Sequence, residues 1–312
     1  MGFLMMSQRT VLLLTIVAIV RVTLSHSGEF AYPPHMEGAR TECYKTIGDT
    51  KLNLYIFQPP DAAGGTTRPA IVFFFGGGWT SGSPAQFETQ CRYLASRGMV
   101  AIAADYRVAA RHGVKAAQCV ADARSAMRWV RAHATQHGID PHRIAAGGGS
   151  AGGHLAAATA FIAELDDEKD DKTVNAAPDA LVLFNPALVL APLPDVKLEG
   201  FASRATAERF GAKPEQISPA HHVVAGGPPA IIFHGRADTT VPFAMTQSFA
   251  DKMKAVGNRC ELHAYDGQQH GFFNHDPWRT ETLIKVDRFL ASLGWLQGQP
   301  TLKLPEKTGE TK

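Results

Sequence analysis

The sequence predicts an α/β fold in which a mostly parallel central sheet has an antiparallel N-terminal edge and helices on both faces. Short, continuously apolar runs, typical of strands buried on both sides of a sheet, alternate with amphipathic helical segments over most of the chain. A hairpin pattern precedes this series and supplies the antiparallel strands. Because no linker divides the series, we expect one domain over residues 26–300.

Each element has a local signal in the chain. Two alternating segments around the turn Gly48-Asp49 predict the hairpin. Uninterrupted apolar runs predict the buried strands, and apolar residues at helical spacing, closed by glycines such as Gly98 and Gly138, predict the helices. In chain order we expect strands at 43–46, 52–57, 70–75, 99–104, 144–146, 180–184, 230–233 and 261–265, and helices at 84–97, 115–137, 151 onward, 244–256 and 280–293.

Three segments fall outside this alternation. The proline-punctuated stretch 185–219, with a short helix near 205–210, is expected to be a small insertion over the face where the strands end. The charge run 166–171 is expected to be a solvated loop. The polar tail 301–312 is expected to be disordered.

The N-terminus has the pattern of a targeting segment. Arg9 precedes an apolar run at 11–20, which is too short for a comfortable membrane span and suits a signal peptide over residues 1–25. Small residues permit cleavage after Ser25, although Arg21 just past the apolar run is atypical. We therefore expect export to the periplasm or the medium without stable membrane association, and the alternative is an uncleaved anchor.

Composition and motifs give no reason to expect a nucleic acid, a metal or a cofactor. The chain has 312 residues, is 45% hydrophobic and carries a net charge of +2, which gives no reason to expect a nucleic acid partner. No metal-binding motif and no cofactor motif is present, so neither a metal nor a cofactor is expected. The four cysteines, none of them in a C-x-x-C spacing, leave one disulfide and buried free thiols equally consistent. Among pairings, Cys91 with Cys119 is preferred. The sequence leaves the oligomeric state open.

A glycine-dense turn carries the first candidate catalytic residue. The segment Gly148-Gly149-Ser150-Ala151-Gly152 fits G-x-S-x-G and stands between an apolar run and an alanine-rich run. A serine on such a tight strand-to-helix turn needs glycine neighbours, because side chains there would clash with the chain passing close by. The pattern predicts that Ser150 is a nucleophile at the positive end of a helix.

Two later residues complete a triad. Asp238 follows the strand at 230–233, and His270 follows the strand at 261–265. Either residue alone could be an ordinary loop residue, but functional groups of open α/β sheets gather where the strands end. The chain order Ser150, Asp238, His270 is the order of the α/β-hydrolase layout. We therefore predict a nucleophile, an orienting acid and a base.

The run Gly76-Gly77-Gly78 is the candidate oxyanion loop. Backbone N–H groups of Gly77 or Gly78, together with that of Ala151, would face the developing negative oxygen. A phosphate-cradling loop is excluded because the segment lacks a lysine and no helix starts at once. Trp79 beside the loop is expected either to line an acyl pocket or to pack in the core.

These segments resemble an α/β-hydrolase-fold serine esterase of the hormone-sensitive-lipase-like and carboxylesterase type. The resemblance is greatest to small exported enzymes described as acetyl xylan or feruloyl esterase-like. Beyond the segments above, it rests on Asp105-Tyr106-Arg107, His234-Gly235-Arg236-Ala237-Asp238 and His270-Gly271-Phe272. Two positions depart from the family pattern: Phe75 stands where a histidine usually precedes the glycines, and Gly149 replaces the usual aspartate before the serine. Neither departure removes a catalytic group.

The resemblance and the residues together predict hydrolysis of short-chain acyl esters through an acyl-enzyme, with acetylated or feruloylated carbohydrate as candidate substrates. One alternative is a serine peptidase of the prolyl-oligopeptidase type, although the chain has no room for the propeller domain that such enzymes carry. Another is a hydrolase-fold protein that binds without catalysis. His154 and the pair His221-His222 are expected to serve in packing.

Overall fold

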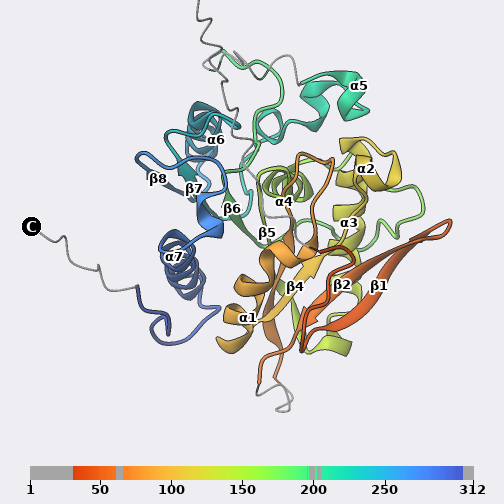
Figure 1. The fold of residues 1–312 in the computed structure, drawn as a ribbon, viewed down its shortest axis with the longest axis vertical. Coiled ribbons are helices and arrows are strands. Elements are labelled where there is room, and N and C mark those ends of the chain that lie inside the picture. Colours follow the sequence, from red (N-terminus) through yellow and green to blue (C-terminus); the bar gives the residue numbers. More distant parts are fainter. Residues whose placement is uncertain (1–30, 61–65, 195, 197–200, 202–204, 305–312) are drawn as a thin grey trace, which may run out of the picture.

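The strands of the protein form one central sheet. The computed structural model describes residues 31–60, 66–194, 196, 201 and 205–304. In that part of the chain an eight-stranded sheet has the order β1-β2-β4-β3-β5-β6-β7-β8. The first two strands pair antiparallel with each other, β2 pairs antiparallel with β4, and all later pairs are parallel. The hairpin and β8 lie at opposite edges (Figure 1). The predicted fold class is confirmed.

The observed elements follow the predicted series closely. The strands are β1 (Arg40–Ile47), β2 (Thr50–Phe57), β3 (Arg68–Phe74), β4 (Val100–Ala104), β5 (Ile139–Gly149), β6 (Ala180–Phe184), β7 (Ala230–Gly235) and β8 (Cys260–Tyr265). The α-helices are α1 (Glu88–Ser96), α2 (Ala109–His112), α3 (Ala116–Ala132), α4 (Ala151–Phe161), α5 (Ala207–Phe210), α6 (Phe243–Ala255) and α7 (Trp278–Ser292). Short 3₁₀ turns are η2 (Pro84–Phe87), η3 (Thr135–His137), η5 (Pro214–Ile217), η6 (Pro219–His221) and η7 (Phe272–Asn274).

The core consists of two apolar layers, one on each face of the sheet. Successive side chains of a strand point to opposite faces, so neighbours such as Ile71 and Val72 belong to different layers. The layer that contains Val72 packs against α3, α4 and α6, and the layer that contains Ile71 packs against α1 and α7. This arrangement leaves the carboxyl ends of the parallel strands as the edge where loops can gather functional groups.

The sheet separates the two cysteines that the sequence paired. Cys91 lies on α1 and Cys119 lies on α3, so the two buried side chains belong to layers on opposite faces. All four cysteines are free thiols. The preferred Cys91–Cys119 disulfide is therefore wrong. The alternative of buried free thiols holds for Cys91, Cys119 and Cys260, whereas Cys43 is an exposed thiol.

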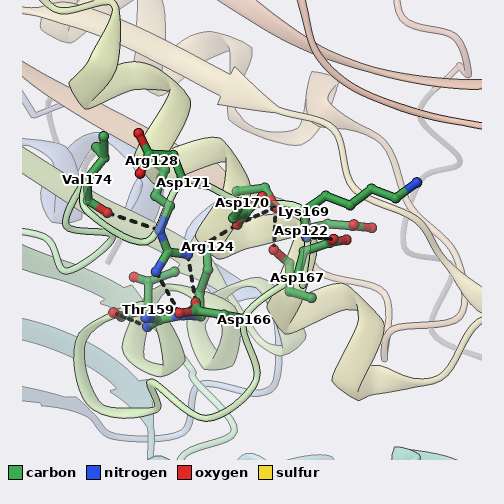
Figure 2. Close-up of polar contacts among 12 residues, drawn as sticks. Asp122, Arg124, Arg128, Thr159, Asp166, Asp167, Lys169, Asp170, Asp171 and Val174 are labelled. Carbon is green, nitrogen blue, oxygen red and sulfur yellow. Dashed lines mark hydrogen bonds and ion pairs between the residues drawn. The ribbon is translucent and has the colours of Figure 1, made fainter.

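The charge run 166–171 is docked on α3, and the prediction of a solvated loop is wrong for half of it. The guanidinium of Arg128 donates to Asp166 at 2.6 Å and to Asp170 at 3.1 Å, and Arg124 also donates to Asp166 (Figure 2). Asp167 pairs with Lys45 of β1 at 2.7 Å. Burial alone would raise the pKa of Asp166, but the hydrogen bonds from Arg128 and Arg124 hold it below its usual range.

The insertion 185–219 contains α5, η5 and the start of η6 in its described part. Its short helix was expected near 205–210 and is observed at Ala207–Phe210. The predicted signal peptide, 1–25, and residues 305–312 of the predicted tail lie outside the described residues. Among the helices of the described chain, none combines the length and apolarity that a membrane crossing requires.

Candidate active site

Ser150 occupies a strained turn between β5 and α4. Its backbone has φ 54° and ψ −117°, a combination that costs a non-glycine residue about 1–3 kcal/mol. Glycine is required around it: a Cβ at Gly152 would lie 2.0 Å from the Phe74 carbonyl oxygen, and one at Gly148 would lie 2.4 Å from the carbonyl carbon of Gly152. The turn therefore holds the Ser150 side chain at the N-terminus of α4, where the helix dipole favours negative charge.

The structure brings together the three side chains that the sequence named. His270 Nε2 lies 2.9 Å from Ser150 Oγ, and His270 Nδ1 lies 2.7 Å from Asp238 Oδ2. Because a carboxylate only accepts hydrogen bonds, Nδ1 carries the proton of a neutral imidazole and Nε2 is left as the acceptor for the Ser150 hydroxyl. This arrangement can move a proton from Ser150 to His270.

The surroundings of Asp238 keep its carboxyl ionised. Its side chain is fully buried, which by itself would raise the pKa. Hydrogen bonds from His234 and His270 and from the backbone N–H of Val241 outweigh burial and hold the pKa of Asp238 far below its usual range. The N–H groups of Thr240 and Val241 reach Oδ1 at 2.8 and 2.9 Å. The carboxylate is thus fixed in orientation as well as in charge.

Asn185 holds the loop that carries His270. It follows β6, is 1% exposed and has φ 34°, which is unusual for a residue with a side chain. Its Oδ1 accepts a hydrogen bond of 3.0 Å from the N–H of Gly271. Asn274 Nδ2 donates to the carbonyl of the same glycine at 3.0 Å. Asn185 was not predicted from the sequence, because it belongs to no recognised motif and only the sheet register brings it beside the histidine loop.

The glycine run after β3 forms a loop beside Ser150. A Cβ built at Gly76 would lie 3.5 Å from Ser150 Cβ, and the Gly76 N–H donates to Gln86 Oε1 at 2.6 Å. Gly77 has φ 126° and fits only without a side chain, because a Cβ there would lie 2.2 Å from the Ser81 carbonyl oxygen. Gln86 was also missed, since an isolated glutamine carries no sequence signal.

The three backbone N–H groups predicted to line the oxyanion hole belong to Gly77, Gly78 and Ala151. Within the described part of the chain, the N–H groups of Gly77 and Gly78 have no recorded acceptor. Ala151 is the first residue of α4, and the first N–H groups of a helix have no partner within it. These are the donors that the sequence named for an oxyanion hole, and their role stays a prediction.

Aromatic packing holds the base of the glycine loop at Phe75. Its ring stacks on the ring of Tyr106 with centroids 4.1 Å apart, and the Tyr106 hydroxyl donates to the Phe75 carbonyl at 2.6 Å. Both side chains are fully buried. The base of the glycine loop is therefore fixed without the histidine that usually stands at this position in the family that the motifs resemble.

Trp79 is part of the core. Its side chain is 5% exposed, its ring packs edge-on against Phe210 of the insertion, and its Nε1–H donates to His154 Nδ1 at 3.2 Å. Burial lowers the pKa of His154 to about 4, so the ring is neutral and its Nε2–H donates to the carbonyl of Ile217 at 2.7 Å. The packing alternative for Trp79 thus describes its surroundings, and contact with substrate stays a prediction.

The pair His221-His222 makes contacts with nearby residues of the insertion. His221 bonds to Ser218 Oγ at 2.9 Å, and His222 Nε2 lies 3.0 Å from the carbonyl oxygen of Glu215. In the part of the chain covered by the structure, no group of three or more His, Cys, Asp or Glu side chains is placed to hold a metal ion.

The BD-FAE family model matches residues 54–253 of the chain. Solved structures of esterase 2 from Thermogutta terrifontis are also similar. Its propionate-bound form is 50% identical with a TM-score of 0.82, and the match covers 86% of this chain and 100% of that one. Its butyrate-bound form is 51% identical, also with a TM-score of 0.82, and covers 87% and 100%.

Curated relatives are more distant and longer. The probable carboxylic ester hydrolase LipM of Mycobacterium tuberculosis is 29% identical over 77% of this chain and 58% of its own length. Esterase LipC of the same organism is 31% identical over 68% of this chain and 55% of its own length. The chain therefore spans little more than half the length of these two relatives.

Proposed function

Because this chain belongs to the BD-FAE family and shares the α/β-hydrolase fold of the esterases that it matches, we propose that it is a carboxylic ester hydrolase with Ser150 as its nucleophile. The observation that carries the proposal is the continuous contact from Ser150 Oγ through His270 to the ionised Asp238, built at the end of a strained turn. All three side chains are held by hydrogen bonds or backbone geometry before any substrate arrives.

The proposed reaction is acyl transfer to water. Ser150 Oγ attacks the ester carbonyl carbon while His270 Nε2 takes the hydroxyl proton, and the buried Asp238 stabilises the imidazolium. The N–H groups of Gly77 or Gly78 and Ala151 bind the oxyanion of the tetrahedral intermediate. His270 then protonates the departing alcohol, and water attacks the acyl-enzyme by the same steps in reverse order.

We further propose that the preferred acyl groups run from acetyl to butyryl. Support comes from the esterase of Thermogutta terrifontis, which has been seen with propionate and with butyrate bound. The insertion 185–219 is short, and in its described part it packs through Phe210 on Trp79 beside the glycine loop. A further methylene that fits adds about 0.8 kcal/mol of burial, whereas one that clashes with packed rings costs about 1–3 kcal/mol.

We also propose an exported location and a carbohydrate ester as the substrate. The apolar run at 11–20 supports export, and an exported esterase of this type suits acetylated or feruloylated carbohydrate. N-terminal sequencing of protein from the native host tests the first point, and an intact Met1 on cytoplasmic protein would refute it. Release of acetate or ferulate from polysaccharide tests the second.

The decisive experiment combines a substrate series with one substitution. We expect kcat/KM to be far higher for p-nitrophenyl acetate and butyrate than for the octanoate and palmitate esters. Ser150→Ala should lower hydrolysis on the order of 10⁴-fold or more, whereas Ser248→Ala, at a buried serine of α6, serves as the control. A fluorophosphonate probe should label Ser150 alone. Active protein labelled at another serine would overturn the assignment, and a preference for long acyl chains would overturn the acyl proposal.

A further inference from the structure

A second histidine contacts the acid of the proposed triad. His234 lies on β7, four residues before Asp238, and is fully buried. Its Nε2 lies 3.2 Å from Asp238 Oδ2 and 2.8 Å from the carbonyl oxygen of Val241. Its other nitrogen, Nδ1, lies 2.7 Å from Thr246 Oγ1 on α6. Asp238 Oδ2 is therefore contacted by two imidazoles, that of His234 and that of His270.

The partners of His234 determine its protonation. A carbonyl and a carboxylate can only accept hydrogen bonds, so Nε2 must carry a proton. The Thr246 hydroxyl can donate to Nδ1, which satisfies a neutral ring in a fully buried place. The neutral Nε2–H tautomer thus fits these contacts, with its one proton donated to the Val241 carbonyl at 2.8 Å and directed less closely at Asp238 Oδ2, which lies 3.2 Å away.

The surroundings leave His234 no other charged partner among its recorded contacts. On α6, Phe243 packs edge-on against the ring with centroids 5.8 Å apart, and Thr246 contributes only a hydroxyl. The guanidinium of Arg236 stacks on the Phe243 ring, 4.6 Å from its centroid. The ionisable groups near His234 are therefore Asp238, which it contacts directly, and His270, which it reaches only through the Asp238 carboxylate.

We propose that His234 is a positioning residue that fixes Asp238 for its contact with His270. The inference rests on the proposed function, because it assigns a task within the same triad. The N–H groups of Thr240 and Val241 hold Oδ1, and without His234 only His270 would contact Oδ2. The His234 N–H restricts rotation of the Asp238 carboxylate. It also offsets part of the negative charge on Oδ2, so that this oxygen attracts the proton of His270 less strongly.

The proposal predicts a particular pattern of kinetic changes. His234→Met removes the donor, whereas His234→Gln is matched in length and can place an N–H near the position of Nε2. Because a hydrogen bond to a charged group is lost, kcat should fall on the order of 10- to 100-fold in the methionine variant. The KM should stay within about twofold, since a fully buried side chain cannot contact substrate. The glutamine variant should keep kcat within about threefold of wild type.

The pH profile separates positioning from a general loss of structure. Once Oδ2 has lost a donor, it attracts the proton of His270 more strongly, so the base becomes protonated at higher pH. The acidic limb of the kcat/KM profile should therefore move to higher pH in His234→Met and stay near its wild-type position in His234→Gln. A variant that is merely destabilised would lose active protein without moving the limb.

A double-mutant comparison tests whether His234 acts through Asp238. In the background of Asp238→Asn, the further change His234→Met should lower kcat by less than about twofold, because the group that it positions has been altered. Full, multiplicative loss in the double variant would overturn the proposal. Equal kcat in wild type and folded His234→Met would also overturn it. If Ser150→Ala keeps the activity, the proposed function fails instead.

Nuclear magnetic resonance of the wild-type protein keeps the test independent of how the variants fold. Long-range proton–nitrogen spectra of histidine-labelled protein, assigned with His234→Gln, report which ring nitrogen carries the proton. We expect His234 to carry it on Nε2 at pH 7.5. A bare Nε2 with a protonated Nδ1 would overturn the proposal, because that nitrogen could not donate to Asp238.

Discussion

Asp105 makes the stability of the protein depend on pH in an unusual direction. The carboxyl follows β4 and is 1% exposed. Burial raises its pKa from 3.8 to about 6, although the Tyr32 hydroxyl, the charge of Arg111 and the N–H of Tyr106 act to lower it. The folded state therefore binds this proton more tightly than the unfolded chain does.

The size of the effect follows from linkage. A rise of the pKa from 3.8 to about 6 corresponds to about 3 kcal/mol of unfolding free energy, which is present below the unfolded pKa and is lost as the pH rises through the folded one. Between pH 4.5 and pH 7.5 the loss should be about 2 kcal/mol. Asp105→Asn removes the titration while keeping the shape of the side chain. Relative to wild type, the variant should therefore be more stable at pH 7.5 than at pH 4.5 by about 2 kcal/mol.

Urea unfolding of wild type and Asp105→Asn at both pH values measures how the difference in unfolding free energy between the two proteins changes with pH. The titration of the other carboxyls is the same in both proteins and cancels. Asp49→Asn removes a carboxylate from the exposed hairpin turn and is the matched control, expected to stay within about 0.5 kcal/mol of wild type at both pH values. If the gap between wild type and Asp105→Asn is the same at pH 4.5 and pH 7.5, the reasoning about Asp105 is refuted.

Two further predictions concern stability, one through packing and one through ion pairs. Gly149→Ala should lower the free energy of unfolding, measured in urea, by about 1–3 kcal/mol, because a Cβ there would lie 2.6 Å from Phe273 Cζ. A smaller residue in place of Phe273 should suppress this loss of stability. If Gly149→Ala leaves the free energy of unfolding unchanged, the prediction is wrong. Arg128→Met should cost about 1–3 kcal/mol, because Asp166 and Asp170 lose a partner. Thermal unfolding measures the second change, and an unaltered midpoint would show that the docked loop adds no stability.

Local patterns in the sequence were sufficient to predict the fold and the meeting of the three side chains of the proposed triad. Continuous apolar runs mark strands buried on both faces, and parallel strands end at a common edge. Ser150, Asp238 and His270 each follow such a run closely, so their meeting could be expected without knowledge of any side-chain contact.

Residues that act through register could not be found in this way. Phe184 pairs with Gly149 on one side and with Phe233 on the other, which places Asn185 between the serine turn and the strand of His234. That placement depends on how β5, β6 and β7 align, and no local pattern encodes it. The prediction of a solvated loop at 166–171 was wrong for a related reason. The composition of the segment indicates exposure to solvent, but its partners Arg124 and Arg128 lie about 40 residues earlier in the chain, on α3.

The glycine before Ser150 shows how a departure from a family pattern becomes understandable once the packing is known. Phe273 occupies the space beside Gly149, and its ring stacks on Phe184 at 4.6 Å and on Phe87 at 6.0 Å. An aspartate at position 149 would have to displace this ring from a fully packed layer. Gly149 and Phe273 therefore depend on each other: the aromatic side chain fills the volume beside Ser150 that a carboxylate at position 149 would otherwise occupy. A chain with an aspartate at 149 should accordingly need a smaller residue at 273.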